Sequence, residues 1–366
     1  MTALIRALVE CESPSDYPAA VDQFVDLIGD VLSPYGKVRT IDGGRFGRHL
    51  RCEITLPGVW RSEQQILVLG HSDTVWPVGT LKAMPFRQAQ DRLWGPGVLD
   101  MKAGIAFFVF AIRALKEQSV PVQRRIVLLL NSDEEVGSES SRPLTEREAR
   151  RSAAVLVLEP GTGLEGKVKT ARKGVGVMNV RVLGKAAHAG VDFAAGASAV
   201  VELARQIGKI AAFTNLKRGI TVNPGVIAGG SRSNVVAAEA SAEVDFRVVR
   251  ARDAVGLERK FHALRPFDRR CKLEVAGGMN RPPMERSAGV VRLFRTAKSV
   301  AADLGVRLEE SSTGGGSDGN FTAALGVPTL DGLGAVGEGA HAAHESILIE
   351  RMADRTALLA KLLATL

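Results

Sequence analysis

The sequence predicts an α/β fold: a main domain with a mixed, largely parallel sheet flanked by helices, interrupted by an inserted ferredoxin-like α+β domain. Three runs, at 66–70, 126–130 and 154–158, consist almost entirely of Val, Ile, Leu and Ala. Continuous apolar runs of this length are typical of strands buried on both faces of a parallel sheet. A later stretch follows the order β-α-β-β-α-β, and the first kind of pattern returns near residue 284.

Helices are predicted on either side of the first strand. Apolar residues at helical spacing over 21–32 indicate an amphipathic helix packed on the sheet. A glycine-rich turn at 94–104 then places Asp100 at the start of an apolar stretch, 103–116, which we expect to be a buried helix. After the inserted domain the pattern predicts a helix at 290–304, a short strand at 327–330 and a closing helix to Leu366.

The inserted stretch has the order of a split βαβ module. Its expected elements are a strand at 176–183, a helix at 197–212, strands at 220–228 and 240–248, a helix at 254–264 and a strand at 273–276. We therefore assign residues 1–174 and 285–366 to the main domain and residues 175–284 to the inserted domain.

Charge and composition restrict the class of partner. The 366 residues carry 48 Lys and Arg against 40 Asp and Glu, and the net charge of +8 is compatible with nucleic acid or with anionic small substrates. The basic residues are interleaved with acidic ones, and only 5% of the chain is aromatic. Because nucleic-acid surfaces need a basic stripe or stacking aromatics, we expect no nucleic-acid partner.

The sequence also predicts a cytoplasmic protein. Three widely separated cysteines, Cys11, Cys52 and Cys271, argue against a disulfide framework. The N-terminus has no basic segment followed by an apolar stretch, so no signal peptide is expected. No apolar run approaches the roughly 20 residues that span a bilayer, so we expect no membrane partner.

Acidic and imidazole side chains follow the predicted strands directly. In strand order they are His71 and Asp73, Glu134 and Glu135, and Glu159, with Asp100 in the intervening turn. Ligands of parallel sheets bind outside the carboxyl ends of the strands, so we expect these groups to converge. A single His-x-Asp or Glu-Glu pair is usually a solvated feature of the protein surface. Several carboxylates beside buried strands, however, would cost several kcal/mol each without a partner, and a divalent cation would hold them.

Nitrogen and oxygen ligands without cysteine suit Zn²⁺, with Mn²⁺ or Co²⁺ as alternatives. A loop near the C-terminus carries two further histidines, His341 and His344. Two histidines and three carboxylates exceed one tetrahedral site, but they fit two metals that share one carboxylate and one water. One further carboxylate would then be available as a general base.

These residues lie in motifs that resemble the M20 metallopeptidase family, and within it the glutamate carboxypeptidase branch. The resemblance covers nearly the whole chain in the same order. The motifs span residues 70–75 (GHSDTV), 95–104 (GPGVLDMKAG), 133–138 (DEEVGS), 158–160 (LEP), 184–190 (GKAAHAG) and 313–318 (TGGGSD).

The resemblance implies a role for each group at the strand ends. One zinc ion would be bound by His71 and Glu159 and a second by Glu135 and His341. Asp100 would bridge the two ions. Glu134 would be the general base and Asp73 would orient His71. The peptide bond after Asp100 is expected to be cis. His341 is favoured over His344 as the last ligand because Gly339-Ala340-His341 matches the Gly-x-His pattern of the family.

The inserted domain carries further candidates. His188 would by default be a surface histidine, and the resemblance makes it a donor to the substrate carbonyl, acting in cis or from the partner subunit. Asn234 and Arg247 would hold the substrate α-carboxylate, although a strand-borne Arg is more often salt-bridged. Gly315 and Gly316 would present backbone N–H groups to the same substrate. Domain closure is expected to bring Arg247 and Asn234 onto the carboxylate.

The resemblance therefore implies a dizinc metallohydrolase that cleaves a C-terminal amino acid, with glutamate as the candidate, from a peptide or N-acyl conjugate by metal-activated water. An N-acyl amino acid deacylase or a dipeptidase of the same family is the alternative, and an inactive binding homologue is a distant one. In this reading the main domain is catalytic, and the inserted domain is a lid that also pairs two chains in a homodimer.

Overall fold

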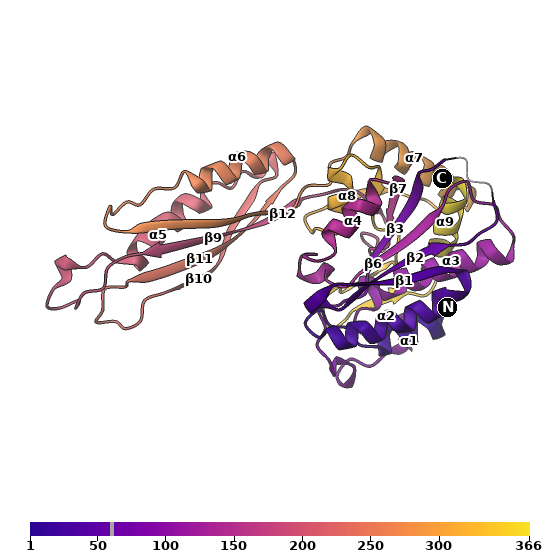
Figure 1. Cartoon of the computed structure of the whole chain (residues 1–366), viewed down its shortest axis with the longest axis horizontal. Coiled ribbons are helices and arrows are strands. Elements are labelled where there is room, and N and C mark those ends of the chain that lie inside the picture. Colours follow the sequence, from indigo (N-terminus) through magenta and orange to yellow (C-terminus); the bar gives the residue numbers. More distant parts are fainter. Residues whose placement is uncertain (59–61) are drawn as a thin grey trace. The chain divides into compact units, whose positions relative to one another are not determined.

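The computed structural model describes residues 1–58 and 62–366 (Figure 1). The chain packs as two compact units. The first contains residues 1–171, 286–313 and 317–366, and the second contains residues 172–285 and 314–316. The roles predicted for them, catalytic domain and lid or dimerisation domain, stay predictions.

The first unit is built on a six-stranded sheet in the order β1-β2-β6-β3-β7-β14. Its strands are β1 Gly36–Asp42, β2 Arg48–Ile54, β3 Gln65–His71, β6 Ile126–Asn131, β7 Ser152–Val157 and β14 Thr329–Leu330. The pairs β3/β6, β3/β7 and β7/β14 are parallel, whereas β1/β2 and β2/β6 are antiparallel. The predicted mixed, largely parallel sheet is confirmed.

Both faces of this sheet are covered by helices. Ile66 and Val68 of β3 belong to one apolar core, while Leu67 and Leu69 belong to another on the opposite face. This alternation explains why the central strands are continuous apolar runs. The larger core is formed with α1 Thr2–Glu10, α2 Pro18–Leu32, α3 Ala103–Glu117, α7 Ala288–Asp303 and α9 Arg351–Thr365, and the smaller one with α4 Arg142–Ala149. The short helix α8 Gly319–Ala324 contacts α4, β7 and β14.

Several elements of the first unit were not predicted. Strand β1 is mostly exposed and has few apolar residues, so its sequence carries little periodic signal. Strand β2 was not predicted either, because charged residues interrupt its short sequence. The others are short: α1, α4 and α8, the pair β13 Glu310–Thr313 with β8 Val168–Arg172, and a small sheet ordered β15-β16-β5-β4 (Gly337–Glu338, Ser346–Leu348, Arg92–Trp94 and Arg87–Ala89). The small sheet matters for the site because β15 and β16 flank His341.

The second unit is an antiparallel sheet in the order β10-β11-β9-β12 with its own apolar core. Its elements follow the predicted order: β9 Gly174–Leu183, α5 Ala199–Ala211, β10 Thr221–Gly229, β11 Glu239–Val248, α6 Ala251–His262 and β12 Lys272–Arg281. This is the strand order of the split βαβ module. Strands β10 and β12 form its two edges (Figure 1).

Within the described residues, no helix is long and apolar enough to cross a bilayer. The three cysteines are free, as predicted.

Candidate metal centre

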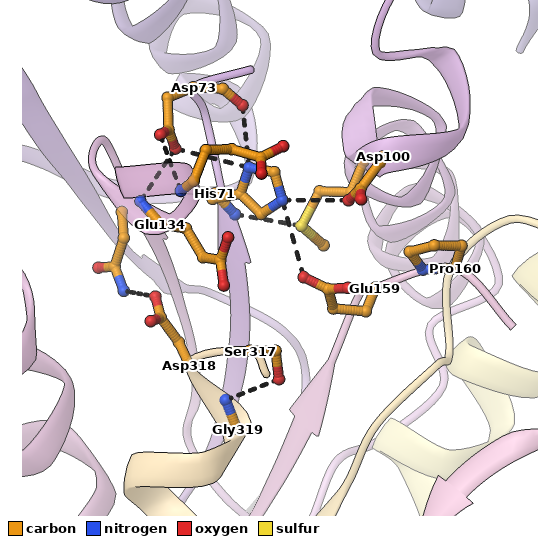
Figure 2. Close-up of polar contacts among 12 residues, drawn as sticks. His71, Asp73, Asp100, Glu134, Glu159, Pro160, Ser317, Asp318 and Gly319 are labelled. Atoms are coloured by element: carbon orange, nitrogen blue, oxygen red, sulfur yellow. Dashed lines mark hydrogen bonds and ion pairs between the residues drawn. The ribbon is translucent and has the colours of Figure 1, made fainter. Parts of the chain in front are cut away.

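The candidate site lies where three parallel strands of the first unit end. β3 ends at His71, β6 is followed by a short turn at Glu134–Val136, and β7 is followed by Glu159. Asp100 lies in an irregular turn, Val98–Lys102, that leads into α3. Because neighbouring parallel strands bring their carboxyl ends to one edge of the sheet, these side chains meet there (Figure 2).

The turn that carries Asp100 depends on Gly97. Gly97 has a left-handed φ of +70°, and a Cβ there would lie 2.8 Å from Cγ2 of Thr74, so the turn requires glycine. The Asp100–Met101 peptide bond is cis, as the family resemblance implied.

Asp100 lies between two histidines. Its Oδ1 is 3.2 Å from Nε2 of His71, and its Oδ2 is 3.5 Å from Nε2 of His341. Each histidine has a second carboxylate beside it: Glu159 Oε1 is 3.7 Å from Nε2 of His71, and Glu135 Oε1 is 3.1 Å from Nε2 of His341. The predicted ligands thus form two halves that share Asp100.

The donor set fits divalent cations. Ligand atoms of His71, Glu134 and Glu159 lie within 4.8 Å of one another, and so do those of His71, Asp100 and Glu135. His71 is buried, as is Glu159. Imidazole nitrogens and carboxylate oxygens without thiolate are the donors that zinc, manganese and cobalt accept. So many carboxylates at such short range repel one another unless positive charge lies among them.

The pKa values of the site show the same excess of negative charge. Burial alone would lower the pKa of His71, but contacts with Asp100 and Asp73 raise it well above its ordinary value. Hydrogen bonds to Asp100 and Glu135 raise the pKa of His341 to about 10. Burial works against the charged form of Asp100, yet the two histidines hold the pKa of its carboxyl far below the usual range. The field that keeps protons on these imidazoles also favours a bound cation.

Asp73 links His71 to the turn that carries the predicted base. Its Oδ1 accepts from the backbone N–H of Glu134 at 3.2 Å, and its Oδ2 accepts from that of Glu135 at 3.1 Å. Nδ1 of His71 lies 3.5 Å from Oδ1 of Asp73 and 2.9 Å from its backbone oxygen. Ser15 also donates to Oδ2 at 2.7 Å, a contact that the sequence gave no reason to expect.

His341, and not His344, lies against the carboxylates. It has a left-handed φ of +61° and a half-exposed side chain, and it follows Gly339, whose φ is +83°. The structure also adds a residue that sequence reasoning missed: Glu345 is fully buried and accepts a hydrogen bond from the backbone N–H of Asp100 at 3.0 Å.

The glycine-rich segment at 313–318 contributes to both units. In the second unit, the carbonyl oxygens of Gly315 and Gly316 accept from Nη1 of Arg172 at 3.2 and 2.8 Å. In the first unit, Asp318 accepts hydrogen bonds from Asn131 and Ser138. The hydrogen bond from Asn131 therefore places Asp318 next to the end of β6.

The second unit brings His188 and Asn234 together. His188 is exposed and forms a β-bridge with Val235, and the backbone N–H of Ala189 donates to the carbonyl oxygen of Asn234 at 3.0 Å. The two predicted substrate residues are thus neighbours on adjoining segments.

Arg247 lies far from that pair. Its Nε is 3.0 Å from both carboxylate oxygens of Asp245, and its Nη1 donates to the carbonyl of Gly314 at 3.3 Å. The β9/β11 ladder alone runs eight residues from Glu239 to Arg247, which is about 26 Å at ~3.3 Å per residue. Asn234 precedes Glu239. Within one chain, Arg247 and Asn234 therefore lie too far apart to reach one small carboxylate together, and the substrate-binding role of each stays a prediction.

Comparison with known proteins identifies related sequences over most of the chain. A model described as peptidase family M20/M25/M40 matches residues 67–365. Carboxypeptidase G2 from Pseudomonas sp. (strain RS-16) is 32% identical over 289 residues, which cover 77% of this chain and 68% of that protein. Succinyl-diaminopimelate desuccinylase from Delftia acidovorans is 26% identical, with 82% of each chain covered.

Solved structures share the fold. Aminopeptidase PepT from Bacillus cereus superposes with a TM-score of 0.82 at 23% identity, and the match covers 99% of this chain and 97% of the other. At that identity the likeness concerns the fold alone.

Proposed function

This chain belongs to peptidase family M20/M25/M40, and on that premise we propose that it is a dizinc carboxypeptidase that removes a C-terminal amino acid, with glutamate as the candidate. Membership makes it a metal-dependent hydrolase of peptide or related amide bonds. The observation that supports the two-metal form is the position of Asp100, which offers one oxygen toward His71 and the other toward His341.

Five side chains would hold the metals: His71 and Glu159 on one, His341 and Glu135 on the other, and Asp100 on both. When bound, a metal pair of this kind polarises a carbonyl and lowers the pKa of bound water to about 7. Nδ1 of His71 faces Asp73, so its Nε2 is the nitrogen that would face the cation.

Glu134 would be the general base. Its ligand atoms lie within 4.8 Å of those of His71 and Glu159, so its carboxylate reaches the space in which the cleaved carbonyl would lie. Asp73 fixes the turn by accepting the backbone N–H of Glu134. The Glu134 carboxylate would take a proton from the attacking water and give it to the amine nitrogen as the C–N bond breaks.

Arg247 would bind the α-carboxylate of the substrate. Asp245 holds one edge of the guanidinium through its Nε and Nη2, and the other edge can still pair with a second carboxylate. A free carboxylate on the substrate would then be required for tight binding, which is the property of a carboxypeptidase.

A homodimer would complete this arrangement. His188 and Asn234 lie too far along the β9/β11 ladder from Arg247 to reach one small substrate from the same chain, so we assign them to the site of a second copy. An apolar groove lined mainly by α5 and the edge strand β10 supports the pairing, since Ile227 in it is 64% exposed. Sedimentation should give a dimer, and a stable monomer would contradict this assignment.

The runner-up is an N-acyl amino acid deacylase, which the similarity to succinyl-diaminopimelate desuccinylase supports. A dipeptidase of the same family is a further possibility. These activities would use the same metal centre and differ only in the groups that recognise the substrate.

A matched substrate set separates these functions. It contains an N-acyl-glutamate, the same compound with its α-carboxylate amidated, and N-acyl conjugates of apolar and basic amino acids, each assayed with zinc and with chelator. We expect cleavage only with the free α-carboxylate, fastest for glutamate and abolished by chelator. Faster cleavage of an apolar or basic conjugate would instead support the N-acyl amino acid deacylase. If no conjugate is cleaved, the carboxypeptidase proposal fails and dipeptides become the next set.

A further inference from the structure

A buried carboxylate, that of Glu345, contacts the turn that carries Asp100 and is not among the predicted metal ligands. Glu345 has no exposed surface and lies four residues after His341, directly before β16. Its Oε1 accepts from the backbone N–H groups of Leu99 and Asp100 at 2.8 and 3.0 Å. Its Oε2 accepts from Gly97 N–H and from the indole N–H of Trp76, both at 2.8 Å.

These four donors come from the two segments that deliver His71 and Asp100. Trp76 follows the end of β3, while the other three N–H groups belong to the turn before α3. The turn before α3 is irregular, with non-helical backbone angles at Asp100 and Met101, and the buried Glu345 carboxylate gives its N–H groups the acceptors that buried backbone donors require. Burial raises the pKa of the Glu345 carboxyl, and the four donors oppose this effect by stabilising the charged form.

Glu345 is at the same time part of the loop that carries His341. This loop runs from β15 to β16, which pair with each other, and β16 pairs with β5. Within it, Ala342 N–H donates to Gly339 O at 2.8 Å, and Glu345 N–H donates to Ala342 O at 2.9 Å. The backbone of Glu345 therefore closes the His341 loop, while its side chain binds the Asp100 turn.

We propose that Glu345 is a positioning residue that sets the spacing between Asp100 and His341, so that both can bind the same cation. The proposal rests on the metal centre argued above. His341 Nε2 and Asp100 Oδ2, which are 3.5 Å apart, lie on two loops, and Glu345 connects these loops. His341 also adopts a left-handed backbone conformation, which is unfavourable for a residue with a side chain and persists only where its surroundings hold it.

Glutamine at position 345 tests this role with little change in volume. It replaces one oxygen by an NH₂ group, which turns toward two N–H donors instead of accepting from them. Since loss of a partner that orients metal ligands typically weakens metal binding 10- to 100-fold, we expect a loss of about that size at the His341 site. Trp76→Phe removes one donor and keeps a six-membered aromatic ring, so a smaller loss, roughly threefold, is expected. Glu350→Gln makes the same chemical change at an exposed position of the same segment and should change nothing.

The measurements are zinc affinity by chelator competition, the visible spectrum of the Co²⁺-substituted full-length chain, and thermal unfolding of the metal-free protein. Weaker binding together with an altered Co²⁺ spectrum in Glu345→Gln, graded through Trp76→Phe, supports the proposal. Wild-type affinity and spectrum in Glu345→Gln would overturn it, even if thermal stability fell. If Glu345→Gln does not fold, an unchanged affinity in Trp76→Phe overturns it. A wild-type chain that binds no metal would instead refute the metal centre, and this inference with it.

Discussion

Replacing Asp73 with asparagine is expected to reduce turnover while leaving the fold intact. Asp73 is buried, and its two oxygens accept the backbone N–H groups of Glu134 and Glu135 and the hydroxyl of Ser15. An asparagine has one oxygen and one NH₂ group. The less costly orientation keeps the oxygen toward Glu135 and Ser15 and turns the NH₂ toward the N–H of Glu134.

The size of the effect follows from this exchange. A hydrogen bond to a charged group contributes about 1.5–3 kcal/mol, and each 1.4 kcal/mol is about tenfold in a rate or equilibrium constant. Loss of the Glu134 contact, and of the negative charge beside His71, should therefore lower kcat/KM roughly 10- to 150-fold. Ser15→Ala leaves the charge in place and should cost less, about tenfold or below.

Steady-state kinetics with the N-acyl-glutamate substrate measures this effect, with zinc content determined on the same samples. Asp42→Asn is the matched control, because Asp42 is exposed and undergoes the same change of charge. An Asp73→Asn enzyme with wild-type kcat/KM and full zinc content would refute the role given to Asp73.

Further substitutions test other parts of the account. Glu134→Gln should retain its metals and lose nearly all turnover, and a wild-type rate would exclude Glu134 as the base. Asp245→Asn should raise KM roughly tenfold for the N-acyl-glutamate substrate, because Asp245 holds the Arg247 guanidinium, and it should leave the zinc content unchanged. An unchanged KM would exclude a role of Asp245 in substrate binding. Arg355→Met should lower the free energy of unfolding by about 3 kcal/mol, because buried Arg355 donates to the carbonyls of Gly166, Gly332 and Gly334. Urea denaturation measures this free energy, and an unchanged value would contradict the role given to Arg355. Burial acts to raise the pKa of Glu202, but donors from Gln206, Asp268 and Phe267 outweigh it and lower that pKa. The stability that Glu202 contributes is thus complete above its unfolded pKa of about 4.3 and is lost as the pH falls through the lower folded value. Thermal unfolding should show that Glu202→Gln lowers Tm at pH 7 and makes it less dependent on pH below 5; parallel curves for the two proteins would contradict this.

The strand ends were predictable because two signals coincide there. The runs that became β3, β6 and β7 are continuous in apolar residues, and parallel strands bring the residues that follow them to one edge. The positions of His71, Glu134 and Glu159 after these runs were therefore enough to predict that the three side chains lie close together. The Gly-x-His pattern then selected His341 from two nearby histidines.

Contacts that depend on side chains from distant loops were not predictable. Ser15 and Glu345 act through hydrogen bonds to groups that lie 58 or more positions away in the chain, and neither belongs to a periodic pattern. The distance between Arg247 and Asn234 likewise depends on the register of β9 with β11, which sequence motifs do not encode. Strand β1 escaped prediction because most of its side chains are exposed.

Metal content tests the central claim most directly. Elemental analysis of the wild-type chain, His341→Ala and His344→Ala, each purified in zinc and freed of excess metal, should give two, one and two zinc ions per chain. The account requires the loss with His341→Ala because that histidine lies against Glu135 and Asp100. One zinc in the wild-type chain, or a loss with His344→Ala but not with His341→Ala, would contradict it.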